Sequence, residues 1–474
     1  MLGRIVSKMC IIRTLRIVSS ALVLLLSACA TTTTITTTNE WSPSADSKRD
    51  PRAAQVPRVD LSKQSVSSVM APSNNLWIHI RQGFQLPELD SPLVLQQTRW
   101  LTARPDYLDR SMARSSRYLF YIVEEVNRRK MPSELALLPF VESAFNPEAK
   151  STAKAMGIWQ FMPRTGKDFK LTQNVFRDER RDVIQSTNAA LDYLQRLYNQ
   201  FGDWQLALAA YNWGEGNVAK AIKRNQAQRK PTDYRSLTMP RETREYVPKL
   251  MAYKHIVNDP AAYGIVLPEL ENHPYFVAID VTRDIDVEVA AQLAEMSLAD
   301  FRNLNPAFNK PVILGATDQQ MLLPFTRAEL FQMNLASYSK PLSSWTALTV
   351  TKSETPEQLA TRLELNSQVI RDVNNIPRGM RIRAGSTILI PKPPGKDSDI
   401  PMHVAEHGQL KLDKTTPPKP KTAKPSQGNS TKASTAKLKT ASTQQKSPST
   451  NAPKSAKTGS GSGSGVSAGV KTTP

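Results

Sequence analysis

Residues 134–147 read ELALLPFVESAFNP, an apolar run that ends in a glutamate. If this stretch is helical up to the serine that follows Glu142, Leu135 and Leu138 stand seven and four residues before Glu142 and share its face. Glu142 then points where apolar side chains point, and the loss of hydration raises its pKa. The alternative is a helix-end residue that turns to solvent, because Pro139 limits or kinks the helix.

A carboxyl group that keeps its proton near neutral pH can protonate a departing glycosidic oxygen, and three later stretches fit sugar chemistry. Residues 157–163 read GIWQFMP and combine a glycine, which permits close backbone approach, with a large aromatic face and an amide. Residues 209–214 read AAYNWG and end an apolar helix with a phenol, an amide and an indole. Residues 241–253 read RETREYVPKLMAY and place Tyr246 on one face with Leu250. Taken singly, the last two stretches are explained by ordinary core packing.

The order Glu-Ser, Gly-Ile-Trp-Gln, Ala-Tyr-Asn and Tyr-Val, within about 105 residues, resembles the catalytic domain of the soluble-lytic-transglycosylase (SLT-like) enzymes. The likeness covers residues 115–257. It implies a lysozyme-like α fold that cleaves the MurNAc-β-1,4-GlcNAc bond of peptidoglycan without adding water and leaves 1,6-anhydro-MurNAc ends. One departure, Ile158-Trp159 where many relatives carry Leu-Met, puts fine subsite preference in doubt.

The resemblance also implies roles for individual residues. Glu142 is the acid and later the base, and Tyr246 bonds to it. The residues that the resemblance places in contact with substrate are Ser143, Gly157, Gln160, Tyr211, Asn212 and Tyr246.

Only one carboxyl group belongs to the matched motifs, whereas ordinary glycosidases pair two, about 5 Å apart for retention and about 6.5 to 9.5 Å apart for inversion. We therefore expect the MurNAc N-acetyl and 6-hydroxyl groups to meet the charge at the sugar carbon. Glu148, Asp178 and Glu215 remain candidates for a second carboxylate, so a lysozyme-like hydrolase of the same bond is an alternative. A non-catalytic peptidoglycan-binding lipoprotein is another.

The N-terminus predicts export and lipid attachment. Residues 1–28 combine basic side chains with an apolar run that is too short to span a bilayer comfortably, which is typical of a signal peptide. The run ends in Leu-Ser-Ala-Cys, which resembles the bacterial lipobox, so Cys29 is the expected lipid site. Ala30 after the cysteine points to the outer membrane, with the enzyme facing the periplasm. Residues 29–75 are rich in Thr, Ser and Pro and predict a tether.

The predicted fold class is multidomain. A mostly α, lysozyme-like (SLT) domain spans residues 76–266, where apolar residues recur with helical periodicity. Two α+β units follow at residues 275–326 and 344–392, and we call them the first repeat and the second repeat. Each is expected to form a strand, two short helices and a returning strand.

The second repeat resembles the LysM module, which binds N-acetylglucosamine-containing glycans. Leu359-Ala360, Val373-Asn374-Asn375 and Ile388-Leu389-Ile390-Pro391 carry this likeness. Ser353-Glu354 stands where relatives often have Gly-Asp, which weakens the expectation for turn geometry and sugar affinity. The first repeat is more degenerate, and a spacer role without ligand is as well supported.

Charge placement argues against nucleic acid as a partner. The formal net charge is +20, but eleven lysines and no acidic residue lie from Lys414 onward. Residues 395–474 therefore predict a disordered Lys/Ser/Thr/Pro-rich tail. No metal cluster or phosphate-cradling loop is evident, and we expect no metal and no cofactor. The expected partners are peptidoglycan glycan strands and, through Cys29, the membrane; no protein partner is predicted.

Overall fold

The structure is a computed structural model that describes residues 75–317 and 319–415. The predicted signal peptide, Cys29, nearly all of the tether and the chain from residue 416 onward lie outside the described residues. None of the helices in the described part has the length and apolar character needed to cross a membrane.

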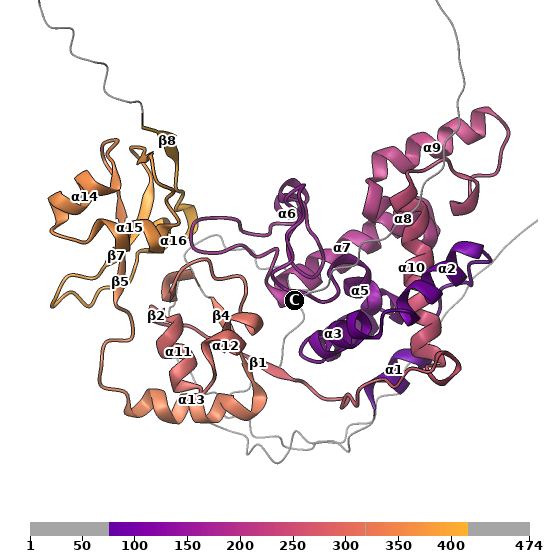
Figure 1. Ribbon diagram of the computed structural model, residues 1–474, viewed down its shortest axis with the longest axis horizontal. Coiled ribbons are helices and arrows are strands. Elements are labelled where there is room, and N and C mark those ends of the chain that lie inside the picture. Colours follow the sequence, from indigo (N-terminus) through magenta and orange to yellow (C-terminus); the bar gives the residue numbers. More distant parts are fainter. Residues whose placement is uncertain (1–74, 318, 416–474) are drawn as a thin grey trace, which may run out of the picture. The chain divides into compact units, whose positions relative to one another are not determined.

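Helices make up the first described part of the chain, from residue 76 to residue 258, drawn in indigo to magenta in Figure 1. We call residues 76–266 the helical domain. Its elements are α1 (Leu76–Gln82), α2 (Pro92–Thr102), α3 (Pro105–Ser115), α4 (Leu119–Arg128), η2 (Ser133–Leu137), α5 (Leu138–Ser143), α6 (Pro163–Asp168), α7 (Val183–Phe201), α8 (Trp204–Trp213), α9 (Glu215–Ala227), η3 (Tyr234–Ser236), α10 (Arg241–Asn258) and η4 (Ala261–Tyr263).

Polar caps and glycines set the boundaries of α7 and α8. Asp182 accepts the backbone N–H groups of the first turn of α7, and Asp203 does the same for α8. Gly202 ends α7 in the left-handed conformation with φ 67°, which costs a glycine little. Gly214 ends α8, as the AAYNWG stretch predicts, and α9 begins at the next residue.

The core of the helical domain continues into the first repeat. The side chains of Leu135, Leu138 and Phe140 are fully buried in this core. It also contains four apolar side chains from beyond residue 270, namely Phe276, Ala278, Leu304 and Leu322. The Tyr121 and Phe276 rings meet with centroids 5.7 Å apart. The helical domain and the first repeat therefore share one apolar core.

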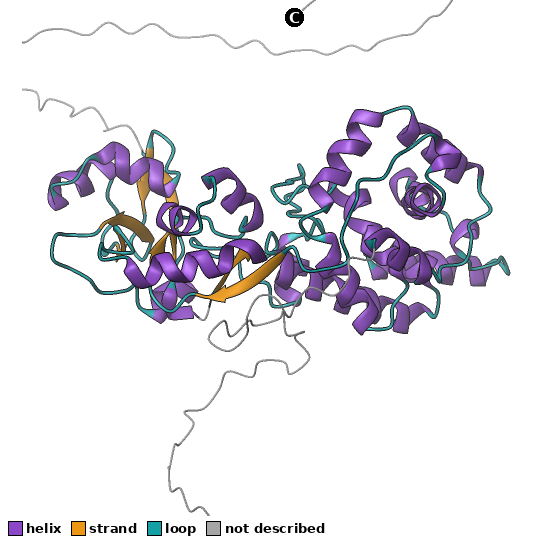
Figure 2. Ribbon diagram, turned by 90° about the horizontal axis from the view of Figure 1, so that it is seen from below, coloured by secondary structure: helices purple, strands orange, loops and turns teal. Residues whose placement is uncertain are grey.

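Strands appear only after the helical domain within the described ranges, as the orange arrows of Figure 2 show. The first repeat contains β1 (Phe276–Asp280), β2 (Ile285–Asp286), α11 (Val287–Leu293), α12 (Leu298–Leu304), β3 (Val312–Ile313), η5 (Gly315–Thr317) and β4 (Gln320–Pro324). The helix α13 (Phe325–Ser337) connects it to the second repeat. The second repeat contains β5 (Trp345–Thr349), α14 (Pro356–Leu363), α15 (Ser367–Asn374), β6 (Met380–Ile382) and β7 (Thr387–Pro391).

The same hydrogen-bond pattern occurs in both repeats. The first and last strands pair antiparallel in each, β1 with β4 and β5 with β7. In the first repeat, the Asn305 side chain accepts from the Leu322 N–H at 2.7 Å and donates to the Leu322 carbonyl at 2.8 Å. Asn374 makes the same two bonds to Leu389, each 2.7 Å long. In each unit a buried asparagine thus holds the returning strand, and this shared feature supports the predicted internal repeat.

The predicted boundary of the disordered tail is wrong, because residues 395–415 are folded. They form α16 (Met402–His407) and β8 (Leu412–Lys414), and β8 pairs with β6. Ile400 and Ala405 are each only 1% exposed and lie in an apolar cluster with Phe176 of the helical domain. This segment is ordered because it covers apolar surface on other parts of the chain, which its own polar composition does not reveal.

Candidate active site

Glu142 lies at the end of a two-part helical segment. The 3-10 helix η2 runs directly into α5, so residues 134–143 do not form one α-helix. The proline in α5 has no N–H to donate to the carbonyl four residues earlier, which favours the break. Ala144 and Phe145 then take left-handed φ angles of 50° and 54° and reverse the chain. The reversal leaves Glu142 on the last turn of α5, with its side chain between helical elements.

Two side-chain contacts join this segment to α10. At its start, the Lys254 ammonium lies 3.2 Å from the Glu134 carboxylate. At its end, the Tyr246 hydroxyl donates to Glu142 Oε1 at 2.5 Å. The two glutamates are eight residues apart in sequence, and so are their two partners. The 134–143 segment therefore runs antiparallel to α10, and the two contacts fix the position of Glu142 along that helix.

Burial raises the pKa of Glu142 to about 7. The hydrogen bond from Tyr246 opposes this change because it favours the charged carboxylate, and so does the positive charge of Lys249. The negative charge of Glu242 raises the pKa further. Within residues 75–317 and 319–415, no Lys, Arg or His nitrogen forms an ion pair with Glu142. The group can therefore hold a proton near neutral pH and also release it.

The turn at residues 157–161 lies against α5. Gly157 has φ +79°, and a Cβ at this position would lie 2.1 Å from the Arg180 carbonyl oxygen, so only glycine fits. The Ser143 hydroxyl donates to the Ile158 carbonyl at 3.0 Å and ties the turn to the end of α5. The Gln160 amide donates to the Gly157 carbonyl at 2.8 Å. Gln160 is thus held by the loop and makes no direct bond to Glu142.

Trp159 does not offer an aromatic face to a ligand, which corrects the interpretation of the GIWQ stretch. Its ring is fully buried, and its indole N–H donates to the Thr187 hydroxyl at 2.9 Å. A buried indole usually finds such a partner, and here the partner lies on α7. The ring is therefore part of the core below the turn.

The end of α8 completes the cluster. The Tyr211 hydroxyl donates to the Trp159 carbonyl at 3.0 Å. Burial raises the pKa of Tyr211 well above its ordinary value, and the charge of Glu142 adds to this shift. The Asn212 amide oxygen accepts from the Thr243 hydroxyl at 2.8 Å and joins α8 to α10.

The three other carboxylates considered from sequence all have cationic partners. Glu148 lies 3.0 Å from Arg181, and Asp178 pairs with Arg180 at 2.6 Å. Glu215 lies 3.0 Å from Arg196 and also accepts from the Tyr193 hydroxyl at 2.8 Å. Such carboxylates are held in structural ion pairs, in contrast to Glu142.

The sequence analysis did not identify several residues that hold the site residues in place. Asp178 was expected only as a possible second carboxylate, and no role in the site was predicted for Glu134, Thr243, Arg180 or Lys254. The equal spacing of Glu134 to Glu142 and of Tyr246 to Lys254 was a usable signal. Nothing in the local pattern around Arg180 indicates its contacts.

Comparisons with known proteins assign the chain to a family. Residues 120–233 match the family model described as the transglycosylase SLT domain, which places the helical domain in that class of enzyme. Residues 275–340 match the model described as the lytic transglycosylase MltD, LysM-like domain. Membrane-bound lytic murein transglycosylase D of Escherichia coli (strain K12) is 34% identical over 334 residues, which are 68% of this chain and 74% of that protein. The chain belongs to the membrane-bound lytic murein transglycosylase D family.

Two further similarities are more distant. Soluble lytic murein transglycosylase of Escherichia coli (strain K12) is 26% identical over 225 residues, which are 45% of this chain and 30% of that protein. The crystal structure of the 70 kDa soluble lytic transglycosylase from Escherichia coli aligns with 24% identity and a TM-score of 0.25 and covers 36% of this chain and 30% of that one.

Proposed function

We propose that this protein is a peptidoglycan lytic transglycosylase that cleaves the MurNAc-β-1,4-GlcNAc bond and leaves 1,6-anhydro-MurNAc ends. The observation that carries the proposal is the environment of Glu142, a carboxyl group with one phenolic partner, no ion pair among the described residues, and a pKa raised to about 7. Family membership supports the reaction class.

In the first step, protonated Glu142 gives its proton to the glycosidic oxygen as the bond to the MurNAc C1 breaks. The N-acetyl oxygen of the same sugar stabilises the positive charge at C1. In the second step, the Glu142 carboxylate removes the proton from the 6-hydroxyl group, whose oxygen bonds to C1 and closes the anhydro ring. The carboxyl group is then protonated again, and no water is consumed.

Neighbouring residues hold this machinery and line the glycan subsites. Tyr246 orients the Glu142 carboxyl group through its hydroxyl, and Ser143 ties α5 to the sugar-binding turn. Gly157 gives that turn its shape. Gln160, Tyr211 and Asn212 offer an amide, a phenol and a second amide to sugar hydroxyl and N-acetyl groups.

Product analysis tests the proposal. Purified protein is incubated with sacculi, and the released muropeptides are identified by mass spectrometry. Anhydro ends are expected, and Glu142→Gln should abolish their release. Reducing ends would instead favour a hydrolase, and the absence of any product from the wild-type protein would favour a non-catalytic glycan-binding protein.

We further propose that the enzyme is anchored in the cell envelope through Cys29, at the outer membrane and facing the periplasm. The support is the lipobox-like sequence before Cys29 and membership of a family whose named relative is membrane-bound. Cys29→Ser should move the protein from the membrane fraction to the soluble fraction and prevent incorporation of labelled fatty acid. Labelling that persists in this variant contradicts the assignment.

The second repeat is proposed to be a LysM module that binds glycan. Its Ser353-Glu354 turn is well supported despite the departure from Gly-Asp. Ser353 Oγ accepts from the Ala384 N–H at 3.2 Å, and the Glu354 carboxylate pairs with Arg362 at 2.6 Å. These two side-chain contacts support the turn in this chain without the Gly-Asp sequence.

Retention on sacculi tests this role. In the Glu142→Gln background, a chain that ends at residue 343 should be retained less than the full chain, because added weak sites raise the local concentration. A chain that ends at residue 415 is the matched control, since it lacks only the lysine-rich tail. Equal retention of all three chains, with folding checked by circular dichroism, contradicts glycan binding by the second repeat.

A further inference from the structure

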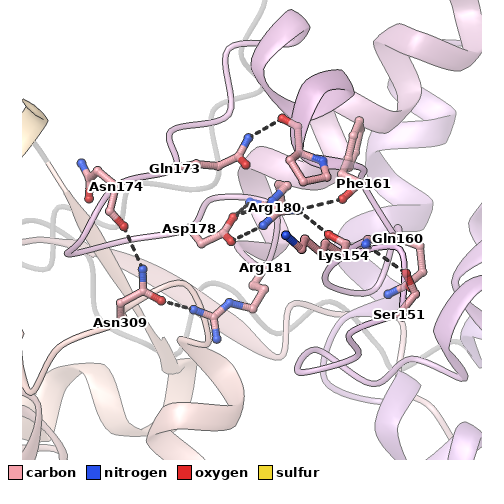
Figure 3. A network of polar contacts seen from close by, with 12 residues as sticks. Ser151, Lys154, Gln160, Phe161, Gln173, Asn174, Asp178, Arg180, Arg181 and Asn309 are labelled. Atoms are coloured by element: carbon pink, nitrogen blue, oxygen red, sulfur yellow. Dashed lines mark hydrogen bonds and ion pairs between the residues drawn. The ribbon is translucent and has the colours of Figure 1, made fainter. Parts of the chain in front are cut away.

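Residues 176–181, which we call the brace segment, contact two parts of the molecule at once. They lie between α6 and α7 in the helical domain. On one side they hold the loop at residues 148–161, which includes the proposed sugar-binding turn, and on the other they pair with residues 307–309 of the first repeat. Figure 3 shows this network, with Arg180 and Arg181 at its centre.

Arg180 holds the loop from one side. Its side chain is buried and pairs with Asp178 through two hydrogen bonds, of 2.9 and 2.6 Å. The same guanidinium donates to the carbonyls of Lys154 at 2.8 Å and Phe161 at 3.2 Å, which flank the turn. The Arg180 backbone oxygen lies against Gly157. A displacement of the brace segment would therefore displace both ends of the turn.

The first repeat pairs with the brace segment through its backbone. The Asp178 N–H donates to the Ala307 carbonyl at 2.9 Å, and the Asn309 N–H donates to the Phe176 carbonyl at 2.7 Å. Phe176 is 2% exposed and lies in an apolar cluster with Val312 of the first repeat. These backbone hydrogen bonds and apolar contacts hold the brace segment against the first repeat.

Arg181 links the two sides directly. Its guanidinium donates to the Asn309 side-chain oxygen and, through Nη1, to Glu148 at 3.0 Å. The next residue after Glu148, Ala149, accepts from the Gly157 N–H at 3.0 Å and from the Gln160 amide at 3.3 Å. A path of hydrogen bonds thus runs from the first repeat to Gln160, with the chain itself as the link between Glu148 and Ala149.

We propose that the first repeat positions the sugar-binding turn through Asn309 and Arg181, in addition to any contact that it makes with glycan. Both are positioning residues, because they act through Glu148 and Ala149. The inference rests on the proposed function, since it takes Gln160 to contact the sugar. It makes the first repeat part of the active-site architecture rather than a spacer.

The contact is not needed to keep the two parts together. Arg117 and Asp300 pair across the same two parts at 2.9 Å, and the Tyr118 hydroxyl donates to the Asn303 carbonyl at 2.6 Å. The shared apolar core adds to these contacts. Loss of the Asn309 side chain should therefore loosen the turn without detaching the first repeat.

Steady-state kinetics on a soluble peptidoglycan tetrasaccharide test the proposal. Arg181→Met and Asn309→Ala should each raise KM by about three- to tenfold, the loss expected for one or two hydrogen bonds, with little change in kcat or in the pH profile. Because both residues lie on one path, the KM of the double variant should be no higher than the higher of the two single-variant KM values. Asn309→Asp keeps an acceptor for Arg181 and should restore the KM.

Asp300→Ala is the matched control, because it removes the Arg117 contact, which joins the same two parts and does not reach the turn; its KM should equal that of the wild type. An unchanged KM in folded Asn309→Ala and Arg181→Met overturns the proposal, and so does an equal rise in Asp300→Ala. Should Arg181→Met fail to fold, Asn309→Ala alone decides. The proposed function fails separately, if Glu142→Gln retains activity on the same tetrasaccharide.

Discussion

The two ends of the 133–143 segment carry glutamates that face the same helix, α10, in opposite surroundings. Glu134 is fully buried and accepts from the backbone N–H groups of Gln85 and Leu86 at 3.0 and 2.9 Å. It also pairs with the Lys254 ammonium. Glu142 receives one phenolic hydrogen bond and no cation among the described residues, and its pKa is raised to about 7.

The difference teaches that burial alone does not make a catalytic acid. A buried carboxylate with a cation and two N–H donors is a structural group, because its negative charge is fully compensated. A carboxyl group that is removed from water without such compensation can keep its proton until a substrate oxygen takes it. The different roles proposed for Glu134 and Glu142 thus rest on their neighbours, although both residues lie on one short segment.

The largest expected effect comes from Glu142→Gln. Loss of the acid should reduce the release of soluble muropeptides by about 100- to 10,000-fold, the usual contribution of general acid-base catalysis. The unfolding temperature should not fall, because the neutral amide has no charge to bury. Turbidity loss of sacculi and thermal unfolding measure the two properties. Activity within tenfold of the wild type contradicts the assignment of Glu142.

Glu134→Gln should lower stability and leave activity unchanged, the opposite of what we expect for Glu142→Gln. It leaves the Lys254 ammonium with the exposed Glu88 carboxylate, 2.8 Å away, as its remaining ionic partner. It also sets an amide NH2 group against the N–H donors of Gln85 and Leu86, and the free energy of unfolding should fall by about 3 kcal/mol. Urea unfolding measures the change, and activity per folded molecule should stay near that of the wild type. Asp90→Asn is the control, since Asp90 is fully exposed and its Arg235 partner lies 3.9 Å away; the midpoint should not move. An unchanged free energy of unfolding in Glu134→Gln would contradict the structural role assigned to Glu134.

The pH dependence of activity should report the proton on Glu142. Activity should fall as pH rises through about 7, because the acid is then deprotonated before substrate binds. Tyr246→Phe removes a bond that favours the charged form, so the falling limb should move to higher pH. Glu242→Gln removes a nearby negative charge, so the limb should move to lower pH. Rates on the soluble tetrasaccharide across pH 5 to 9 measure these shifts, and equal midpoints in all three proteins contradict the electrostatic account.

Ser143→Ala should have the smallest effect. The variant loses the hydrogen bond to the Ile158 carbonyl, which ties α5 to the turn at residues 157–161 and is worth about 1 kcal/mol. We expect kcat/KM to fall by about two- to fivefold. Ser116→Ala, which removes an exposed hydroxyl bonded to the Ala113 carbonyl, should leave kcat/KM unchanged. A larger loss in Ser116→Ala than in Ser143→Ala contradicts the proposed tie.

The sequence predicted the parts of the site that depend on local pattern. Leu135 and Leu138 are fully buried as expected, and the expected neighbour Tyr246 donates to the carboxyl group of Glu142. The single helix that was expected to place both leucines on the face of Glu142 is not formed, because η2 gives way to α5 between them. The helical class of the domain followed from periodicity and agrees with the family match. The catalytic and binding roles of these residues remain predictions.

What the sequence could not predict depends on contacts between distant segments. The pattern around Trp159 predicts an aromatic ring that faces a ligand. The ring lies in the core instead, where its indole N–H donates to the Thr187 hydroxyl on α7. Ile400 and Ala405 stand in a polar stretch and are ordered by apolar surface that includes Phe176. The pairing of Glu134 with a lysine on α10 depends in the same way on the packing of helices.

The apolar core that the helical domain shares with the first repeat has a practical consequence for dissecting the protein. A fragment that stops at residue 266 would turn an internal surface outward and leave the Tyr121 ring without Phe276. Such a fragment is expected to aggregate, whatever its catalytic groups. The smallest product that can be handled alone therefore ends beyond the first repeat, and the boundary between enzyme and accessory module lies later in the chain than the change from helices to strands.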